Sequence, residues 1–272
     1  LLDTDSYSKL MKQSFMFPTM WSITDDPTGW YMHERYSGVR CIWDGKNFYA
    51  KSGKQIATVP KFFTEGMPKG VALDGELCVD YQTYSPEKAA SKNLSIAACK
   101  NEDIWRNRIT FVIYDMPDSS LPIEQRYKEL AKKLEDNADQ TLPRHVKLTR
   151  IEKCRNPRHM NEFFHAAVTK KGASSIVLQA ANSFYVHGRS EHMCEHKAYQ
   201  DTILKFVKVH PTIVSLICEQ DDGQYIVVAC PGQVYSKPPA PGTMINVRHI
   251  GKHSTGKLKH AFYTSVATSA TR

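Results

Sequence analysis

The peptide Glu34-Arg35-Tyr36-Ser37-Gly38-Val39-Arg40, together with Leu73-Asp74-Gly75-Glu76-Leu77, decides how this sequence folds. Residues 30–33 and 39–43 are rich in aromatic and β-branched side chains, which is typical of strands. Asp44-Gly45 is a two-residue hairpin signal that leads into a further strand at residues 47–50. This part of the chain is therefore predicted to form short strands, joined by tight turns, that carry the two quoted peptides.

The next hundred residues mix strands with helices. Residues 109–114 are a run of β-branched and aromatic side chains, which predicts a buried strand. Residues 123–134 and 160–171 have helical spacing, and the first of them is rich in strong helix formers. We therefore predict an α+β domain that extends over residues 1–201.

After about residue 201 the pattern changes to short strands between turns rich in proline and glycine. These strands are predicted at residues 212–218, 225–229 and 244–247. Several short strands in about 70 residues are typical of a small β-barrel, and an OB-fold is common at that size. We predict an OB-fold domain over residues 202–272.

The bulk composition limits the partners. The chain has 272 residues with a formal net charge of +8, which favours an anionic partner such as nucleic acid. The same charge also fits a solvated surface with a basic bias. There is no apolar run long enough for a membrane span, so no membrane partner is expected. The seven scattered cysteines predict reduced thiols, a reducing compartment and no structural metal.

The two opening peptides and the stretches that follow them resemble the adenylation domain of small ATP-dependent DNA ligases, the compact type of some bacteria and of kinetoplast-type mitochondria. Their first motif reads E-K-x-D-G-x-R, and a later one reads D-G-E-L. Further landmarks continue in the family's order through Gly256-Lys257, so the resemblance covers essentially the whole chain; they are Tyr114-Asp115-Met116-Pro117, Glu124-Gln125-Arg126, Gly188-Arg189-Ser190 and Tyr199-Gln200-Asp201. It implies a nucleotidyltransferase (ATP-grasp-like adenylation) domain followed by an OB-fold domain.

The chain departs from the family at the position of the nucleophile. The resemblance implies that a lysine amine attacks the α-phosphate of ATP and forms lysyl-AMP, but this position holds Arg35. A guanidinium keeps its proton in proteins and has no free lone pair with which to attack. The aspartate of the same motif is replaced by Ser37.

Two further motifs are altered. The family's E-G-x-x-L-R motif, whose glutamate holds a metal ion, aligns with Ser174, Ser175 and Gln179. Its L-L-K-x-K motif, whose lysines hold phosphates, aligns with residues 193–197, so one lysine is replaced by Glu195. A second alignment, with residues 203–208, keeps two lysines; we prefer the first because the flanking motifs bracket it at family spacing.

Some family positions are retained. They are Arg40, Glu76, Tyr114 and Lys197. The Asp74-Gly75-Glu76 segment could hold a divalent ion or be a tight turn between strands, and the turn is favoured. Tyr114 could stack near a purine or belong to the core. No cofactor and no metal are therefore predicted, and Arg35 is predicted to enter the old nucleotide pocket and contact Glu76.

The nucleic-acid interpretation depends on the basic side chains of both domains. Phosphate contacts of this kind give affinity without sequence specificity. The candidates are Lys46, Lys51, Lys54, Arg106 and Arg108 in the first domain, and Arg248, Lys252, Lys257 and Lys259 in the barrel. The last three belong to residues 249–260, which are predicted to be a flexible basic loop or a solvated hairpin tip.

The leading hypothesis from these observations is a pseudoenzyme that is not catalytic. It would serve as a nucleic-acid-binding or scaffolding subunit, with RNA or DNA and other protein subunits as partners. A mitochondrial ribonucleoprotein such as a mitoribosome is the proposed assembly, since the chain begins with leucine, as after removal of a transit peptide or trimming. One alternative is a protein–protein scaffold without nucleic-acid contact. Another is a residual ATP-dependent DNA ligase of the mitochondrion, which seals an adenylylated nick.

Overall fold

The computed structural model describes residues 6, 10–11, 14–21, 25–36, 38–79, 96–136, 143–171, 173–253 and 255–267. The chain divides into two compact units, Leu1–His196 and Lys197–Arg272. The predicted boundary after residue 201 falls inside strand β11 (Gln200–Val209), which starts the second unit. No helix among the described residues is long and apolar enough to cross a membrane.

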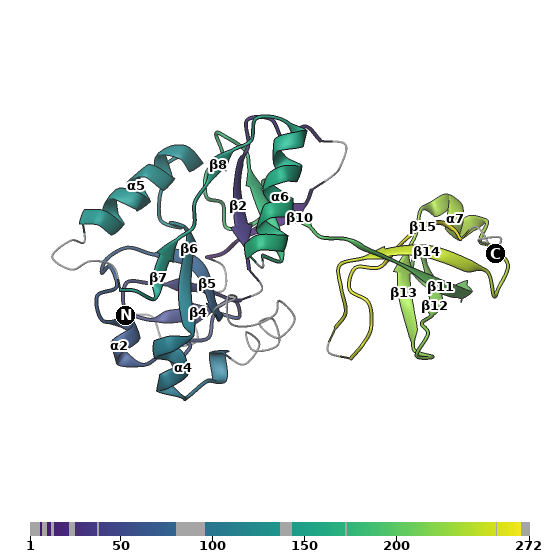
Figure 1. The fold of residues 1–272 in the computed structure, drawn as a ribbon, viewed down its shortest axis with the longest axis horizontal. Coiled ribbons are helices and arrows are strands. Elements are labelled where there is room, and N and C mark those ends of the chain that lie inside the picture. Colours follow the sequence, from purple (N-terminus) through teal and green to yellow (C-terminus); the bar gives the residue numbers. More distant parts are fainter. Residues whose placement is uncertain are drawn as a thin grey trace. The chain divides into compact units, whose positions relative to one another are not determined.

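The first sheet of unit 1 has the strand order β4-β3-β5-β6-β7 (Figure 1). The predicted hairpin is present, since β3 (Val39–Trp43) pairs antiparallel with β4 (Phe48–Ala50). β5 (Leu73–Val79) lies between β3 and β6 (Ile109–Asp115), and β7 (Val146–Leu148) closes the order. Every residue of β5 is buried, so this strand is the centre of the sheet.

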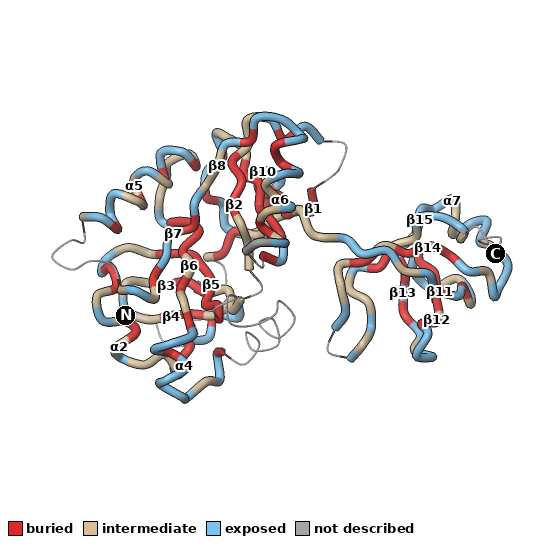
Figure 2. Tube along the Cα trace, in the orientation of Figure 1, coloured by how far each residue is buried: buried red, intermediate tan, exposed pale blue. Residues whose placement is uncertain are grey.

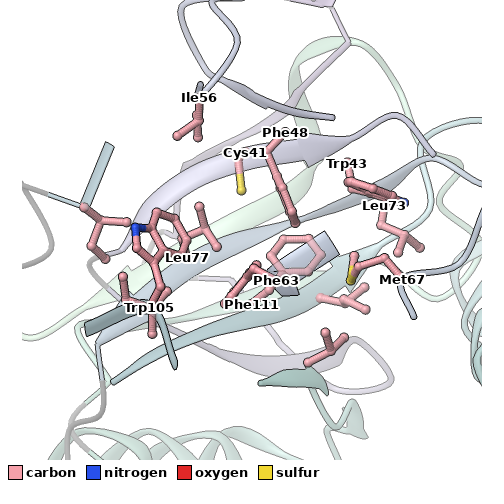
Figure 3. Close-up of a cluster of buried hydrophobic side chains, with 14 of the residues drawn as sticks. Cys41, Trp43, Phe48, Ile56, Phe63, Met67, Leu73, Leu77, Trp105 and Phe111 are labelled. Atoms are coloured by element: carbon pink, nitrogen blue, oxygen red, sulfur yellow. The ribbon is translucent and has the colours of Figure 1, made fainter. Parts of the chain in front are cut away.

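One face of this sheet is covered by aromatic and aliphatic side chains (Figure 3). Trp105 on helix α4 (Glu102–Asn107) packs edge-on against Phe63 of helix α2 (Lys61–Thr64). Helix α5 (Ile123–Asp136) and the short η1 (Ile96–Ala98) add Leu130, Leu134 and Ile96 to the same cluster. Burial of these large apolar side chains is the main favourable contribution to the stability of this half of unit 1.

The second sheet of unit 1 has the order β1-β10-β9-β2-β8. These strands are β1 (Met16–Met20), β10 (Gly188–Lys197), β9 (Ser175–Gln179), β2 (Tyr31–Arg35) and β8 (Glu152–Lys153). Helix α6 (Pro157–Lys171) packs on this sheet through Met160 and Ala167, against Ile176 and Leu178. In Figure 2 the strands of both sheets are the buried parts of unit 1, with exposed helix faces outside them.

Unit 2 is a closed barrel with the order β11-β12-β13-β15-β14. Its strands after β11 are β12 (Ser215–Glu219), β13 (Tyr225–Ala229), β14 (Met244–His249) and β15 (Phe262–Val266), with helix α7 (Gly232–Ser236) between β13 and β14. Buried and exposed residues alternate along β13, as expected for a barrel whose inner side chains fill its core. The predicted small barrel is therefore present.

Candidate active site

The two motif peptides meet because they lie on adjacent strands. β2 ends at Arg35 and β3 begins at Val39, and in the β3–β5 ladder Arg40 is opposite Glu76. The glycines of both motifs are fixed by close packing: a Cβ at Gly38 would lie 2.5 Å from Cys78 Sγ, and one at Gly75 would lie 2.3 Å from the Val112 carbonyl oxygen. Only glycine allows the strands to approach this closely.

Arg35 lies between two carboxylates. Its Nε is 3.6 Å from Glu76 Oε1, and its Nη1 is 3.5 Å from Glu195 Oε2. The Arg35 side chain is 21% exposed, whereas those of Glu76 and Glu195 are 3% and 10% exposed. The predicted contact between Arg35 and Glu76 is confirmed, and the cluster is open to solvent only on the side of the arginine.

Each carboxylate of this cluster has a second partner. Ser175 Oγ donates a 2.6 Å hydrogen bond to Glu195 Oε1, and Tyr114 OH donates a 2.7 Å hydrogen bond to Glu76 Oε2. Burial raises the pKa of Glu76, while Arg35, Arg40 and the hydrogen bond from Tyr114 act against this shift. Burial also raises the pKa of Tyr114 well above its usual range. Tyr114 is therefore a buried hydroxyl that orients Glu76, and its ring is tilted against His33, with centroids 5.1 Å apart.

A second charged pair lies beside the first. Arg40 Nε and Nη2 donate to the two oxygens of Asp74 at 2.6 Å each, and Tyr185 OH donates to Asp74 Oδ2 at 2.7 Å. Burial by itself would lower the pKa of Arg40, but the charge and hydrogen bonds of Asp74 outweigh it and raise the pKa. A bidentate pair of this kind holds both side chains in one orientation.

The residues present do not fit a divalent cation held by the protein alone, although the ligase resemblance implies a metal-binding carboxylate. Asp74 is saturated by Arg40 and Tyr185, and both oxygens of Glu76 are occupied by Tyr114 and Arg35. No group of three metal-ligating side chains is found among the described residues. No step through a protein-held metal ion is derived from this site.

The altered motif positions lie close to Arg35. Ser174 N and Oγ both donate to the Arg35 carbonyl oxygen, at 2.9 and 3.1 Å, and Ser175 is the register partner of Arg35 in the β2–β9 ladder. Glu195 on β10 reaches the same cluster, as the preferred alignment of residues 193–197 requires. In the alternative alignment, Lys205 lies on the barrel and pairs with Glu219. Ser37 lies outside the described residues.

Gln179, at the last altered position, belongs to a buried polar group that joins the two sheets. Its Nε2 donates to Asp115 Oδ2 at 3.3 Å, and Arg126 donates to both oxygens of Asp115 at 2.5 and 3.0 Å. Asp115 is the register partner of Asp74 on β5. The pair Arg126–Asp115 therefore supports the strand that carries Asp74 and Glu76. Lys197 is the last residue of β10.

Sequence reasoning missed Tyr185 and His33. Tyr185 comes from the segment between β9 and β10, 111 residues from its partner Asp74, and no local pattern marks it. His33 is buried on β2, one residue before the first motif, and its Nδ1 lies 2.9 Å from the Glu34 carbonyl oxygen. The alternation of β2 could have placed His33 on the same face as Arg35.

His33 gives the site a pH-dependent stability. Burial lowers its pKa to about 4, from 6.5 for an ordinary histidine. The unfolded chain therefore binds a proton at higher pH than the folded chain, so stability is complete above pH 6.5 and is lost as the pH falls to about 4. A difference of about 2.5 pH units corresponds to about 3 kcal/mol. We expect urea unfolding of unit 1 to show this extra loss between pH 7 and pH 4, and His33→Gln to remove it. An equal pH dependence in the variant would contradict the assignment.

The predicted nucleic-acid residues fall in separate groups. Lys46, Lys51 and Lys54 are exposed around the β3–β4 hairpin and the following turn, and Arg106 on α4 lies over the Phe62 ring, 4.1 Å from its centroid. Arg108 follows α4 and is exposed. The structure does not bring these five into one compact cluster with hydrogen bonds among their side chains that the described residues show.

In the barrel, Arg248 makes a bidentate pair with Asp201 at 2.8 and 3.1 Å. Lys252, Lys257 and Lys259 share one hairpin, which carries a bridge between Lys252 and Leu258. The hairpin is fixed by Gln220 and Gln224, whose side chains donate to the carbonyl oxygens of Gly256 and Thr255. The predicted flexible loop is therefore a braced hairpin, with residue 254 outside the described part of the chain.

Known proteins with the same architecture are DNA ligases. No protein-family model matches the chain. The chain is 21% identical over 247 residues to a DNA ligase of Haemophilus influenzae, covering 86% of this chain and 85% of that protein. A solved structure of a Lig E DNA ligase, described as binding DNA with a minimal scaffold, has a TM-score of 0.67 at 21% identity and covers 93% of this chain and 98% of that chain.

Two more distant ligases share the fold. The Chlorella virus DNA ligase-adenylate has a TM-score of 0.53 at 13% identity, covering 93% of this chain and 98% of that chain. The ATP-dependent DNA ligase of bacteriophage T7 has a TM-score of 0.52 at 12% identity, covering 95% of this chain and 100% of that chain. The predicted fold class is thereby confirmed: the chain has the mixed α/β core of DNA ligases, an adenylation domain followed by an OB-fold domain. Its similarity is to the ATP-dependent DNA ligase family, in its minimal type.

These comparisons overturn the leading functional hypothesis. The chain was predicted not to be an enzyme, and to act as a non-catalytic nucleic-acid-binding or scaffolding subunit of an organellar ribonucleoprotein. Both predictions are wrong, because the proteins that match most of its length are DNA ligases, which are enzymes. The physical reason is that a changed side chain at Arg35 or Glu195 leaves the scaffold and the buried charged pairs in place. Replacement of single residues therefore did not justify the conclusion that catalysis is absent.

Proposed function

We propose that this chain is a DNA ligase of the minimal two-domain type, which joins the strands at a nick in duplex DNA. The observation that carries the proposal is the similarity to DNA ligases over most of the chain, including both domains. The site adds support, since Arg40, Glu76 and Tyr114 are retained and held in one orientation by buried hydrogen bonds. Preorganised charges of this kind are what stabilise phosphoryl transfer.

The joining step follows from ordinary phosphoryl-transfer chemistry. The 3′-hydroxyl oxygen attacks the phosphorus of an adenylylated 5′ end, and a new P–O bond forms as the P–O bond to AMP breaks. AMP leaves with the electron pair, and the hydroxyl proton passes to solvent. No covalent bond to the protein is needed in this step.

The earlier transfer of AMP from ATP needs a nucleophile on the protein if it takes place. Residue 35 cannot supply it as an arginine, because its guanidinium has no free lone pair. An amine elsewhere in the chain would have to carry the AMP. Assays with ATP and with an adenylylated end therefore test different parts of the reaction.

The proposal is tested by two sealing assays with magnesium, read on a denaturing gel. One uses a nicked duplex with a 5′-phosphate and ATP, and the other uses the same duplex with a 5′-adenylylated end and no ATP. A longer joined strand in either assay supports the proposal. With ATP, mass spectrometry of the intact protein and its peptides identifies the residue that carries AMP. Absence of joined strand from both substrates would reject the proposed function.

Duplex DNA is also expected to contact the barrel hairpin. Replacing Lys252, Lys257 and Lys259 with glutamine should reduce the slope of log binding constant against log salt by about 0.9 for each lost phosphate contact, about 2 to 3 in total. Filter binding or fluorescence anisotropy across salt concentrations measures this slope. The matched control removes the same charge from helix α5, where Lys128 and Lys133 pair with neighbouring glutamates: Lys128→Gln/Lys132→Gln/Lys133→Gln. Equal slopes for both triple variants would show that the hairpin makes no specific contact with phosphates.

A further inference from the structure

The candidate active site carries more negative than positive charge. Two guanidinium groups, of Arg35 and Arg40, lie among three carboxylates, of Asp74, Glu76 and Glu195. Arg40 is neutralised by its bidentate pair with Asp74. Arg35 is then left with two carboxylates, so the part of the site that is open to solvent has an excess of one negative charge.

Glu195 is fixed where it stands. Its Oε1 accepts the 2.6 Å hydrogen bond from Ser175 Oγ, and Ser175 is fully buried on the neighbouring strand β9. Its Oε2 lies 3.5 Å from Arg35 Nη1, which is longer than a charge-assisted hydrogen bond of about 2.7–2.9 Å. The carboxylate is therefore held in the site by the serine and is only partly compensated by the arginine.

We propose that this site takes a DNA 5′ end that is already adenylylated, and that Glu195 is the residue that turns free ATP away. The proposal rests on the proposed ligase function and names the substrate class of its site. Both ligands bring an adenosine monophosphate group. They differ in the charge that accompanies it and in what lies beyond it.

The charge difference sets the direction of the preference. Free ATP carries about four negative charges at neutral pH on one compact group, whereas the pyrophosphate of an adenylylated end carries about one on each phosphorus. At an effective dielectric constant of about 20, one additional unit charge about 10 Å from a like charge lowers affinity on the order of tenfold. A fixed Glu195 therefore disfavours ATP more strongly than the adenylylated end.

The rest of the molecule acts in the opposite direction for DNA. The chain has a formal net charge of +8, and the phosphates of a duplex gain from that field while free ATP engages little of it. Arg35 agrees with this choice, because a guanidinium can hold a phosphate oxygen but cannot accept AMP covalently. The class of reaction that must supply the substrate is adenylyl transfer to a DNA 5′-phosphate.

Equilibrium binding of two ligands tests the proposal. Affinity for ATP and for a 5′-adenylylated nicked duplex ending in a 3′-deoxy nucleotide, which cannot be joined, is measured for the wild type and for Glu195→Gln. We expect Glu195→Gln to bind ATP at least tenfold more tightly, with the affinity for the adenylylated nick changing less than threefold. Ser175→Ala, which frees Glu195 to turn away, should give a smaller gain for ATP.

Glu191→Gln is the matched control, because it removes the same charge from an exposed position of the same strand. It should leave both affinities within twofold of the wild type. Unchanged ATP affinity in Glu195→Gln, or equal gains for both ligands, would overturn the proposal. Sealing by the wild type is measured separately, so a protein that joins the adenylylated nick but shows no effect of Glu195→Gln retains the ligase function and loses only this inference.

Discussion

Replacing Arg126 with methionine is expected to lower the free energy of unfolding of unit 1 by about 3–5 kcal/mol, the range found when one partner of a buried ion pair is removed. Arg126 is fully buried, and its side chain donates to both Asp115 oxygens and to the carbonyl oxygens of Leu121 and Ser183. Methionine fills a similar volume but leaves the Asp115 carboxylate with only Gln179 and a backbone amide as donors.

Urea unfolding followed by tryptophan fluorescence measures this loss. Lys128→Met on the same helix is the surface control, since Lys128 pairs with Glu124 at an exposed position and its loss should cost less than about 1 kcal/mol. The double variant Asp115→Asn/Arg126→Met removes the stranded charge and should recover part of the stability. If Arg126→Met cost no more than Lys128→Met, this pair would not be what supports the strands of the site.

Gly75→Ala is the second variant with a large expected effect. An added Cβ would lie 2.3 Å from the Val112 carbonyl oxygen and 2.7 Å from the Phe111 ring, and both belong to the neighbouring strand β6. Backbone cannot yield as a flexible side chain does, so the β5–β6 ladder has to open. We expect a cost of about 3 kcal/mol, at the upper end of the range for overpacking.

Because Gly75 stands between Asp74 and Glu76, the same variant should lose nick sealing even at temperatures where it remains folded. Circular dichroism on heating and the sealing assay on the adenylylated nick measure the two effects. Gly232→Ala is the control, since a Cβ there meets nothing within 4 Å, and its stability should stay within about 0.5 kcal/mol of the wild type. A Gly75→Ala protein as stable as Gly232→Ala would show that β5 and β6 can separate without cost.

The sequence predicted the local parts of the fold well, because their causes are local. The hairpin of β3 and β4 follows from Asp44-Gly45, and β13 matches the predicted strand. Helix α4 was missed although Asn101, whose side chain accepts from the amides of Asp103 and Ile104, is a strong N-cap signal. The parallel pairing of β1 with β10 joins segments about 170 residues apart, and no periodicity reports such a partner.

The candidate site shows the same division. The contact of Arg35 with Glu76 was predictable because both belong to motifs of known order. The hydrogen bond from Ser175 to Glu195 was not, since alternation along a strand gives the face of a side chain but not its neighbour in the sheet. The inference that catalysis is absent failed for a different reason: it treated the covalent step at residue 35 as the whole reaction, although strand joining needs no covalent bond to the protein.

The measurement that tests the central claim most directly is a single-turnover assay, with the wild-type protein in excess over a 5′-adenylylated nicked duplex and with Glu76→Gln beside it. Glu76 orients Arg35 and Tyr114, so its charge is part of the site without being needed for DNA affinity. The account predicts that the wild type forms the joined strand and releases AMP in equal amount. It predicts that Glu76→Gln binds the nick as tightly but joins it about 100-fold more slowly, the usual cost of removing one preorganised polar group. No joined strand with the wild type, or equal rates for both proteins, would contradict the claim that this cluster is the active site of a DNA ligase.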